Sequence, residues 1–206
     1  MGSVHPGAPP ELVLFLKQRF DLRCFVETGT LFGNTASWAA RVFPTVYTIE
    51  AEEALWEAAR RRHAHLSNVR FILGQSPAQL WALTPTLDRP LFWLDAHWSG
   101  GYTAGEKAEC PLLDELAAIS AAGLTEAFIL IDDARMFLSP PPPPHKWQQW
   151  PALSDVMNAL RACADPWITV KDDVIIAVPP STRDELAAFW RRPPPSHSRR
   201  ADEANG

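Results

Sequence analysis

CFVETGTLFGNTASWAARVFPTVYTIE, residues 24–50, is the stretch that decides the fold of this chain of 206 residues. It opens with a short apolar run at 24–28, crosses a turn with two glycines, and continues as a helical pattern over 34–42. A second apolar run follows at 46–50. Short apolar runs that alternate with helical patterns are typical of parallel strands joined by crossover helices. This stretch therefore predicts two strands of a parallel sheet with a helix between them.

The same alternation continues along the rest of the chain. Further strands are predicted at 69–73, 91–94 and 127–131, and further helices at 51–65, after Ser76, at 111–122 and at 152–164. Two closing runs, 167–170 and 174–178, are joined by Lys171-Asp172-Asp173, which indicates an antiparallel hairpin. The runs are apolar throughout, as in strands that helices cover on both faces. We therefore predict an α/β fold with a doubly wound, mostly parallel sheet.

Charge and composition disfavour several classes of protein. The chain carries 19 basic and 24 acidic residues, a net charge of −5, which argues against a nucleic-acid-binding surface. Its three cysteines lie far apart, so a disulfide framework and a structural zinc site are both disfavoured. No apolar run approaches the ~18 residues of a membrane span, and the start lacks a signal-peptide pattern. We expect a cytoplasmic protein without a membrane partner, and the excess of arginine over lysine suggests a bacterial source.

The placement of the prolines predicts the domain organisation. Of the 20 prolines, 11 lie near the N-terminus, at 140–144 and at 193–195. Because proline cannot continue a helix or donate to a sheet, the middle run predicts a surface loop. We predict a flexible N-terminus at 1–9, a single domain at 10–192 and a disordered tail at 193–206.

Polar side chains gather where the five predicted parallel strands end. Four of these strands end in acidic residues, and the fifth is followed by a glycine, an amide and a hydroxyl side chain. The residues are Glu27, Glu50, Asp95, Asp132 and Asp133, and Gly74, Gln75 and Ser76. Ligands of open α/β sheets bind outside the carboxyl ends of the strands. We therefore expect the functional site at this edge of the sheet.

The glycine turn at 27–35 restricts the ligand. Gly29 permits a tight turn, and Gly33 permits the close approach of a ligand or of a helix. Leu31 stands where a dinucleotide-binding turn has its middle glycine, which disfavours NAD and FAD. Glu50 follows Gly29 by 21 residues, a spacing typical of an acid that binds both hydroxyls of a ribose.

The start of the helix after this turn is a second candidate contact. Asn34 and Thr35 are candidate caps of that helix. A small anion, such as the carboxylate of an amino acid, suits a helix N-terminus. A ribose contact and an amino-acid contact would therefore lie near each other.

With these features the chain resembles the class I S-adenosylmethionine (SAM)-dependent methyltransferases over roughly residues 22–180. The turn at 27–35 is similar to their first motif, which holds the methionyl part of SAM, and Glu50 would bind the ribose. The resemblance implies a seven-stranded sheet of order 3-2-1-4-5-7-6 with an antiparallel last strand, and SAM as the cofactor. The implied cofactor-binding residues are Glu27, Thr28, Gly29, Thr30, Gly33, Asn34, Thr35, Glu50, Gln75, Ser76 and Asp95.

The second half of the chain resembles a metal-dependent branch of that superfamily. Residues 92–98 and 131–133 are similar to the O-methyltransferases of the catechol and macrocin types, in which Asp95, Asp132 and Asp133 would bind Mg2+. Three carboxylates at neighbouring strand ends would repel one another unless a cation lay among them, and Mg2+ prefers oxygen ligands. Glu109 is a further candidate ligand. Two alternatives need no metal: Asp95 would bind the cofactor's amino group, and Asp133 would cap a turn.

No general base follows from the resemblance, because Trp98 stands where the catechol type has a lysine. His97 is our first candidate, since a histidine pKa of about 6.5 suits proton abstraction at neutral pH. The alternative is a His97 that only hydrogen-bonds the backbone. Arg135 would bind a substrate carboxylate or pair with an acid. The candidate catalytic residues are His97, Asp133 and Arg135.

Two loops are predicted to cover the site. Residues 99–109 contain three glycines, and residues 134–150 are long for a loop in a compact domain. Trp147 and Trp150 would form an aromatic wall for the acceptor together with Trp98, or would pack the loop onto the body of the protein.

These features predict a SAM-dependent methyltransferase that methylates an oxygen of a small-molecule acceptor with the help of Mg2+. One alternative keeps SAM and changes the reaction to N- or carboxyl methylation, or to another use of SAM without a metal. A non-catalytic nucleotide-binding protein and an NAD-dependent protein are the others. The sequence does not identify the acceptor, and specificity would come from the loops, the termini or the partner subunit of a homodimer.

Overall fold

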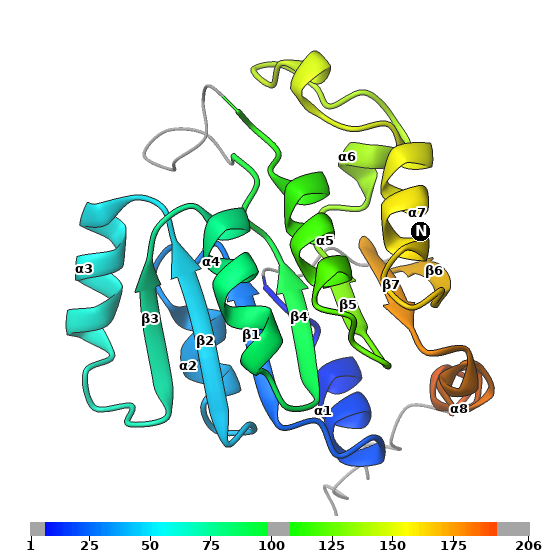
Figure 1. The fold of residues 1–206 in the computed structure, drawn as a ribbon, viewed down its shortest axis with the longest axis horizontal. Coiled ribbons are helices and arrows are strands. Elements are labelled where there is room, and N and C mark those ends of the chain that lie inside the picture. The colour runs from blue at the N-terminus through cyan, green and yellow to red at the C-terminus, as the bar shows by residue number, and fades with distance from the viewer. Residues whose placement is uncertain (1–6, 99–107, 193–206) are drawn as a thin grey trace, which may run out of the picture.

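The computed structural model describes residues 7–98 and 108–192, which contain seven strands in one sheet. The strands are β1 (Cys24–Thr28), β2 (Thr45–Glu50), β3 (Val69–Leu73), β4 (Pro90–Leu94), β5 (Phe128–Ile131), β6 (Trp167–Lys171) and β7 (Val174–Val178). Their order is β3-β2-β1-β4-β5-β7-β6, as predicted (Figure 1). The strands β1 to β5 are parallel, and β7 pairs antiparallel with both β5 and β6.

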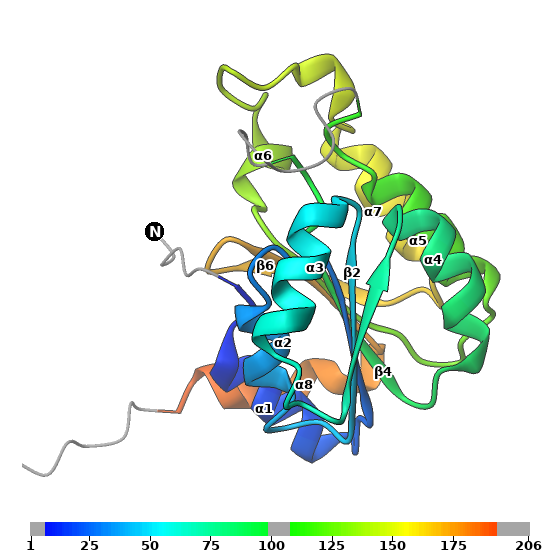
Figure 2. The same ribbon diagram turned by 90° about the vertical axis from the view of Figure 1, so that its left-hand side faces the viewer.

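Helices cover both faces of the sheet, which makes the fold doubly wound (Figure 2). The α-helices are α1 (Pro10–Arg19), α2 (Asn34–Ala39), α3 (Glu53–Arg62), α4 (Ser76–Leu83), α5 (Leu112–Ala121), α6 (Arg135–Leu138), α7 (Leu153–Arg161) and α8 (Arg183–Trp190). Short 3-10 turns occur at η1 (Thr84–Thr86), η2 (Trp147–Gln149) and η3 (Pro180–Thr182). One buried cluster lies between the sheet and α4, α5 and α7, and the other between the sheet and α1, α2 and α8. No helix of the described ranges is long and apolar enough to cross a membrane.

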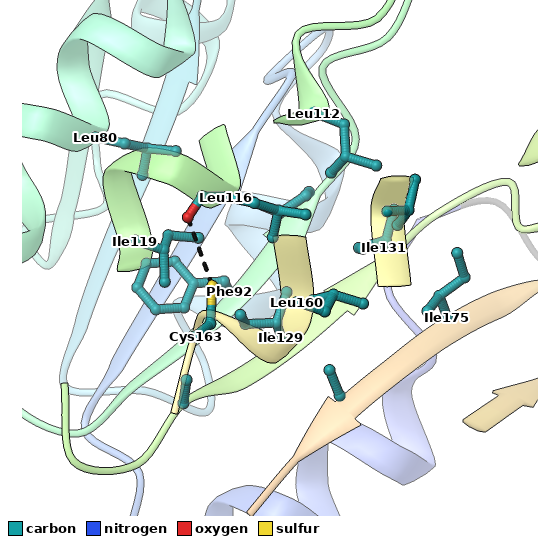
Figure 3. Packing of buried hydrophobic residues seen from close by; sticks show 14 of the residues in the cluster. Leu80, Phe92, Leu112, Leu116, Ile119, Ile129, Ile131, Leu160, Cys163 and Ile175 are labelled. Atoms are coloured by element: carbon teal, nitrogen blue, oxygen red, sulfur yellow. Dashed lines mark hydrogen bonds between the residues drawn. The ribbon is translucent and has the colours of Figure 1, made fainter. Parts of the chain in front are cut away.

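Side chains of α5 and α7 pack directly on the sheet. Leu116 and Ile119 of α5 and Leu160 of α7 pack on Phe92 and Ile129 of the central strands (Figure 3). All five side chains are at most 1% exposed, and burial of a large apolar side chain contributes roughly 1.5–3 kcal/mol. This core fixes β4 and β5, the two strands whose ends carry the candidate acids.

The predicted elements occur with small shifts of their bounds, but three helices were missed. Helix α1 starts at Pro10, in a segment whose prolines suggested a ragged end, and its Val13 and Leu16 are fully buried. Helices α6 and α8 were also not predicted. Strand β3 departs from the expected double coverage, because it lies at the sheet edge and Leu73 is 37% exposed. Residues 1–6 of the predicted flexible N-terminus at 1–9, and the predicted tail at 193–206, lie outside the described residues, and the domain bounds stay a prediction.

Candidate active site

A cavity of about 360 Å3 opens at the carboxyl ends of β1 to β4. Its walls come from the turns that follow these strands and from the segment that leads into α5. The lining residues are Gly29, Leu31, Ile49, Glu50, Ala51, Gly74, Gln75, Ser76, Pro77, Ala78, Asp95, Ala96, His97, Ala108, Cys110, Pro111 and Asp114. The structure thus brings six of the predicted site residues to one cavity: Gly29, Glu50, Gln75, Ser76, Asp95 and His97.

Gly29 is required by the close approach of two strand ends. Its φ is +84°, and a Cβ atom there would lie 2.3 Å from the carbonyl oxygen of Asp95. No side chain fits at that distance, so only glycine lets the β1 turn lie against the end of β4. The sequence suggested that Gly33 lets a ligand or a helix approach closely. In the structure the close neighbour is a side chain, because a Cβ at Gly33 would lie 2.8 Å from Cδ2 of His63. His63 is buried directly after α3, and its Nε2 lies 3.0 Å from the carbonyl oxygen of Phe32.

Glu50 is held firmly at the cavity wall. Its Oε2 accepts a hydrogen bond from the backbone N–H of Leu31 at 2.9 Å, and its Oε1 accepts one from Glu52 at 3.0 Å. The residue is only 6% exposed, yet it lines the cavity. A carboxylate oxygen has two acceptor sites, so Glu50 keeps the capacity to accept hydrogen bonds from a ligand's hydroxyls.

Glu27, in contrast, lies behind the cavity wall. Its Oε2 accepts a hydrogen bond from the hydroxyl of Thr48 at 2.6 Å, and the Thr48 oxygen lies 2.6 Å from that of Thr30. Burial raises the pKa of Glu27 to about 8, although hydrogen bonds from Thr48 and Thr35 oppose the rise. Glu27 therefore serves as a buried support of the turn in this structure and does not line the cavity.

Other predicted cofactor residues also support the wall from behind. The hydroxyl of Thr28 accepts a hydrogen bond from the backbone N–H of Asp95 at 3.2 Å, which ties β1 to β4. The prediction of Asn34 and Thr35 as caps was wrong: Gly33 is the N-cap of α2, with φ +72°, and no side chain caps the helix. A left-handed residue fits this position because the turn must reverse sharply before the helix. Thr28, Thr30, Gly33, Asn34 and Thr35 are not among the residues that line the cavity.

His97 lies between two of the predicted metal acids. Its Nε2 is 3.4 Å from Oδ1 of Asp95 and 3.2 Å from Oδ2 of Asp133. Burial lowers the pKa of His97, although the charge of Asp133 opposes this, and His145 and Arg135 lower the pKa further. The imidazole is therefore neutral at neutral pH and can accept a proton there.

Two acids near His97 have raised pKa values. Burial, followed by the charges of Asp132, Glu27 and Asp133, raises the pKa of Asp95 well above its ordinary value. Burial and the charge of Asp133 raise the pKa of Asp132 to about 7. Asp133 has a left-handed φ of +53°, and its backbone N–H donates to Oδ1 of Asp132 at 2.8 Å. Such strained backbones persist where the surroundings impose them, often at functional sites.

This arrangement does not fit the predicted Mg2+ site. The ring of His97 stands between Asp95 and Asp133, where a shared cation would have to lie. Within the described ranges no three His, Cys, Asp or Glu side chains form a group that could hold a metal ion. Glu109, the further candidate ligand, is completely buried and hydrogen-bonded to residues of the loop at 139–150. A metal would require these side chains to rearrange.

Arg135 pairs with acids of the protein. Its Nη1 lies 2.8 Å from Oδ1 of Asp133, and it also forms an ion pair with Asp173 of the β6–β7 turn. The backbone N–H of Arg135 donates to Oδ1 of Asp173 at 2.9 Å. Of the two roles considered for Arg135, the structure has the acid pair, and through it the β6–β7 turn holds Asp133 in place.

The loop tryptophans divide into one that is buried and one that is exposed. Trp150 is 7% exposed, and its ring centroid lies 5.4 Å from that of His97 and 5.5 Å from that of Phe137. Trp147 is 59% exposed. Trp150 therefore packs the loop onto the body, whereas Trp147 is exposed and does not line the cavity. Residues 99–107 of the loop predicted to cover the site at 99–109 lie outside the described residues.

Sequence reasoning missed several residues of the cavity wall. Leu31, with φ +50°, lines the cavity where a dinucleotide-binding turn would have glycine. Cys110, Pro111 and Asp114 enter from the segment before and within α5. The sequence placed the start of that helix at Pro111 but gave no sign that it faces the strand ends.

The comparisons with known proteins address the fold. No protein-family model matches the chain, and no curated protein matches it by sequence. Solved structures do match. A Staphylococcus aureus protein described as a caffeoyl-CoA O-methyltransferase is 16% identical, with a TM-score of 0.62 over 85% of this chain and 86% of that one.

Two further matches were solved with SAM or with S-adenosylhomocysteine (SAH). The O-methyltransferase from Bacillus cereus in complex with SAH is 20% identical, with a TM-score of 0.56 over 84% of this chain and 82% of that one. The Streptomyces achromogenes O-methyltransferase TomG, involved in tomaymycin synthesis and solved with SAM, is 21% identical. Its TM-score is 0.51 over 85% of this chain and 82% of its own. At these identities the likeness concerns the fold: the chain has the Rossmann-like fold of the class I SAM-dependent O-methyltransferases, as the sequence predicts.

Proposed function

We propose that the protein is a SAM-dependent methyltransferase that methylates an oxygen of a small-molecule acceptor. One observation carries the proposal: a single cavity at the strand ends joins the glycine turn and Glu50 with His97, a buried and neutral histidine. The first part suits the cofactor, and the second suits removal of a proton from an acceptor.

The chemistry of the cavity wall fits SAM. Glu50 has acceptor capacity for the ribose hydroxyls, and the backbone at Gly29 lies open to the methionyl part. Gln75 and Ser76 would lie beside the adenine, and Asp95 would accept a hydrogen bond from the amino group. When bound, SAM would supply an electrophilic methyl group. The side chain of Leu31 at the glycine turn disfavours the pyrophosphate of NAD.

The remaining chemistry falls to residues of the chain. His97 would accept the proton of the acceptor's hydroxyl, because burial keeps the ring neutral. The imidazolium that forms would lie 3.2 Å from Oδ2 of Asp133 and 3.4 Å from Oδ1 of Asp95, and both carboxyl groups would stabilise it. Arg135 would keep Asp133 in position.

Mg2+ is not part of this proposal, because the side chains as arranged do not fit a cation. The sequence prediction of a metal at Asp95, Asp132 and Asp133 therefore keeps its own test, which is given below. Methylation of a nitrogen or of a carboxyl group would use the same cofactor wall. No contact in the described residues favours either of these reactions over methylation of a hydroxyl oxygen.

The test is production of SAH from SAM in the presence of a panel of hydroxyl-bearing small molecules. We expect SAH to form with at least one acceptor, and a His97→Gln variant to lose about a hundredfold or more of that rate. The variant should still bind SAM. An enzyme that binds SAM and forms SAH only with amine acceptors would overturn the choice of oxygen, and full activity of His97→Gln would overturn the choice of base.

A further inference from the structure

Glu109 is a buried carboxylate that the proposed chemistry does not use. It lies just before α5, it is 0% exposed, and it does not line the cavity. An ionised carboxylate is almost never fully buried unless hydrogen-bond donors surround it. The groups that donate hydrogen bonds to Glu109 therefore show which segments the fold joins there.

The donors come from one short segment, residues 145–150. The backbone N–H of Lys146 lies 3.0 and 3.1 Å from the two carboxylate oxygens. The indole N–H of Trp150 donates to Oε2 at 2.9 Å, and Nδ1 of His145 lies 3.2 Å from the same oxygen. Three groups of one segment thus converge on a single carboxylate.

The backbone of Glu109 adds two further ties. Its N–H donates to the side-chain oxygen of Gln149 at 3.0 Å, and its carbonyl oxygen accepts from the N–H of Trp98 at 2.7 Å. Glu109, which lies three residues before α5, therefore joins Trp98 to the segment 145–150. In Figure 1 this part of the chain lies at the carboxyl end of the sheet.

The rings that Glu109 holds are the ones that surround His97. Trp150 lies with its ring centroid 5.4 Å from that of His97, and His145 lies 5.4 Å from Trp150 and 5.5 Å from Trp98 in edge-on contacts. Without Glu109, the indole and imidazole N–H groups and the Lys146 N–H would lose their shared acceptor. The cost of such a loss is large because the site is buried.

We propose that Glu109 is a positioning residue whose carboxylate holds residues 145–150 against His97 and so fixes the acceptor side of the site. The hold itself does not depend on the reaction, but its consequence for the acceptor rests on the proposed function. The carboxylate suits this role: burial alone would raise its pKa, but the hydrogen bonds of Trp150, Lys146 and His145 outweigh burial and lower it. Glu109 therefore stays ionised throughout the neutral range.

Glu109→Ala and Glu109→Gln test this role, with Glu126→Gln as the control. Glu126 is an exposed glutamate between α5 and β5. Hydrogen exchange followed by mass spectrometry should show about tenfold or faster exchange at 142–150 in Glu109→Ala, since loss of a charge-assisted hydrogen bond changes an equilibrium by at least that factor. Glu109→Gln keeps one acceptor oxygen and should fall between wild type and Glu109→Ala. Exchange in β1 and β4 should not change.

Two further readouts separate a local hold from general support of the fold. The Cε1–H proton signal of His97, measured at pH 8, should move when the ring of Trp150 leaves. SAH affinity should stay within about twofold, because the carboxylate of Glu109 bonds to residues 145–150 and not to Glu50 or the glycine turn. Normal exchange at 142–150 together with an unmoved His97 signal in Glu109→Ala would overturn the proposal.

A second variant covers the case in which Glu109→Ala does not fold. Trp150→Phe keeps a ring next to His97 and removes only the indole donor to Glu109, so exchange at 142–150 should rise by a smaller factor. Unchanged exchange in that variant would count against the hold. If wild-type protein binds no SAH, the proposed function fails, but the exchange experiment still decides the role of Glu109.

Discussion

The Nε2 atom of His97 lies 3.2 Å from Oδ2 of Asp133, although the two residues follow different strands, β4 and β5. Asp133 in turn lies 2.8 Å from the guanidinium of Arg135, which also pairs with Asp173 beyond β6. The antiparallel hairpin at the sheet edge therefore reaches the candidate base through two ion pairs. This chain of contacts makes the pH dependence of the proposed reaction predictable.

Asp133→Asn should shift the pH–rate profile to lower pH. The groups that face His97 are Asp95, Asp133, Arg135 and His145, and the negative charge of Asp133 raises the pKa of His97 against the other effects. Removal of that charge lowers the pKa further, so the base stays neutral to lower pH. The maximal rate should fall about tenfold or more, because the imidazolium loses its counter-charge. Turnover measured from pH 5 to 9 checks this, and an acid limb at higher pH than in wild type would contradict it.

Glu115→Gln should stabilise the protein at high pH. Glu115 is 1% exposed on α5, and burial raises its pKa to about 7, although hydrogen bonds to Ser76 and Thr28 oppose the rise. A raised pKa in the folded state means that stability is complete below the unfolded pKa of about 4.3 and declines as pH rises towards about 7. The glutamine is neutral at every pH and escapes this loss.

Thermal unfolding of Glu115→Gln and wild type at pH 5 and pH 8 measures the effect. The melting temperature of the variant minus that of wild type should be larger at pH 8 than at pH 5. A gain of the same size at both pH values, or a larger one at pH 5, would show that Glu115 does not titrate as described.

Trp147→Ala and Trp150→Ala should separate the two loop tryptophans. Trp147 is 59% exposed, so its loss should change the free energy of unfolding by at most about 0.5 kcal/mol. Trp150 is 7% exposed and packs on His97 and Phe137, so its loss should cost about 3 kcal/mol. Both variants should keep wild-type affinity for SAH, as measured by calorimetry. Equal destabilisation by the two changes would contradict the described packing.

Chelation of metals tests whether the reaction needs Mg2+, as the sequence predicts, or proceeds without it, as the side-chain arrangement suggests. Because the ring of His97 stands between Asp95 and Asp133, we expect turnover in EDTA to match that in buffer with Mg2+. A loss of activity in EDTA that Mg2+, Mn2+ or Ca2+ restores would return Asp95, Asp132 and Asp133 to the role of metal ligands. His97 would then have to move out from between them.

The sequence predicted the sheet well because its signals are local. Apolar runs bounded by turns define buried strands, and acids at their ends mark the carboxyl edge, so β1, β2 and β4 and the residues Glu50 and Asp95 were found in this way. Helix α1 was missed because its buried face becomes apparent only when α1 lies on the sheet. The prolines that begin it resemble a frayed end.

The interactions among site residues could not be predicted from the sequence. The sequence left open whether Arg135 pairs with an acid and did not place His97 beside Asp95 and Asp133, whereas the folded chain brings both His97 and Arg135 to Asp133. Nothing in the sequence around Glu109 predicted its contact with Trp150, which lies 41 residues later and donates a hydrogen bond to it. Such contacts depend on which loops meet, and a single sequence does not encode that as a local pattern.

Calorimetric titration of wild type and Glu50→Ala with SAH tests the central claim most directly. Glu53→Ala is the matched control, because Glu53 is exposed at the start of α3 and does not line the cavity. Wild type and Glu53→Ala should bind SAH with similar affinity and ignore NAD, and Glu50→Ala should bind at least about tenfold more weakly, since a charge-assisted hydrogen bond contributes roughly 1.5–3 kcal/mol. Wild-type affinity in a folded Glu50→Ala variant, or binding of NAD in preference to SAH, would contradict the account.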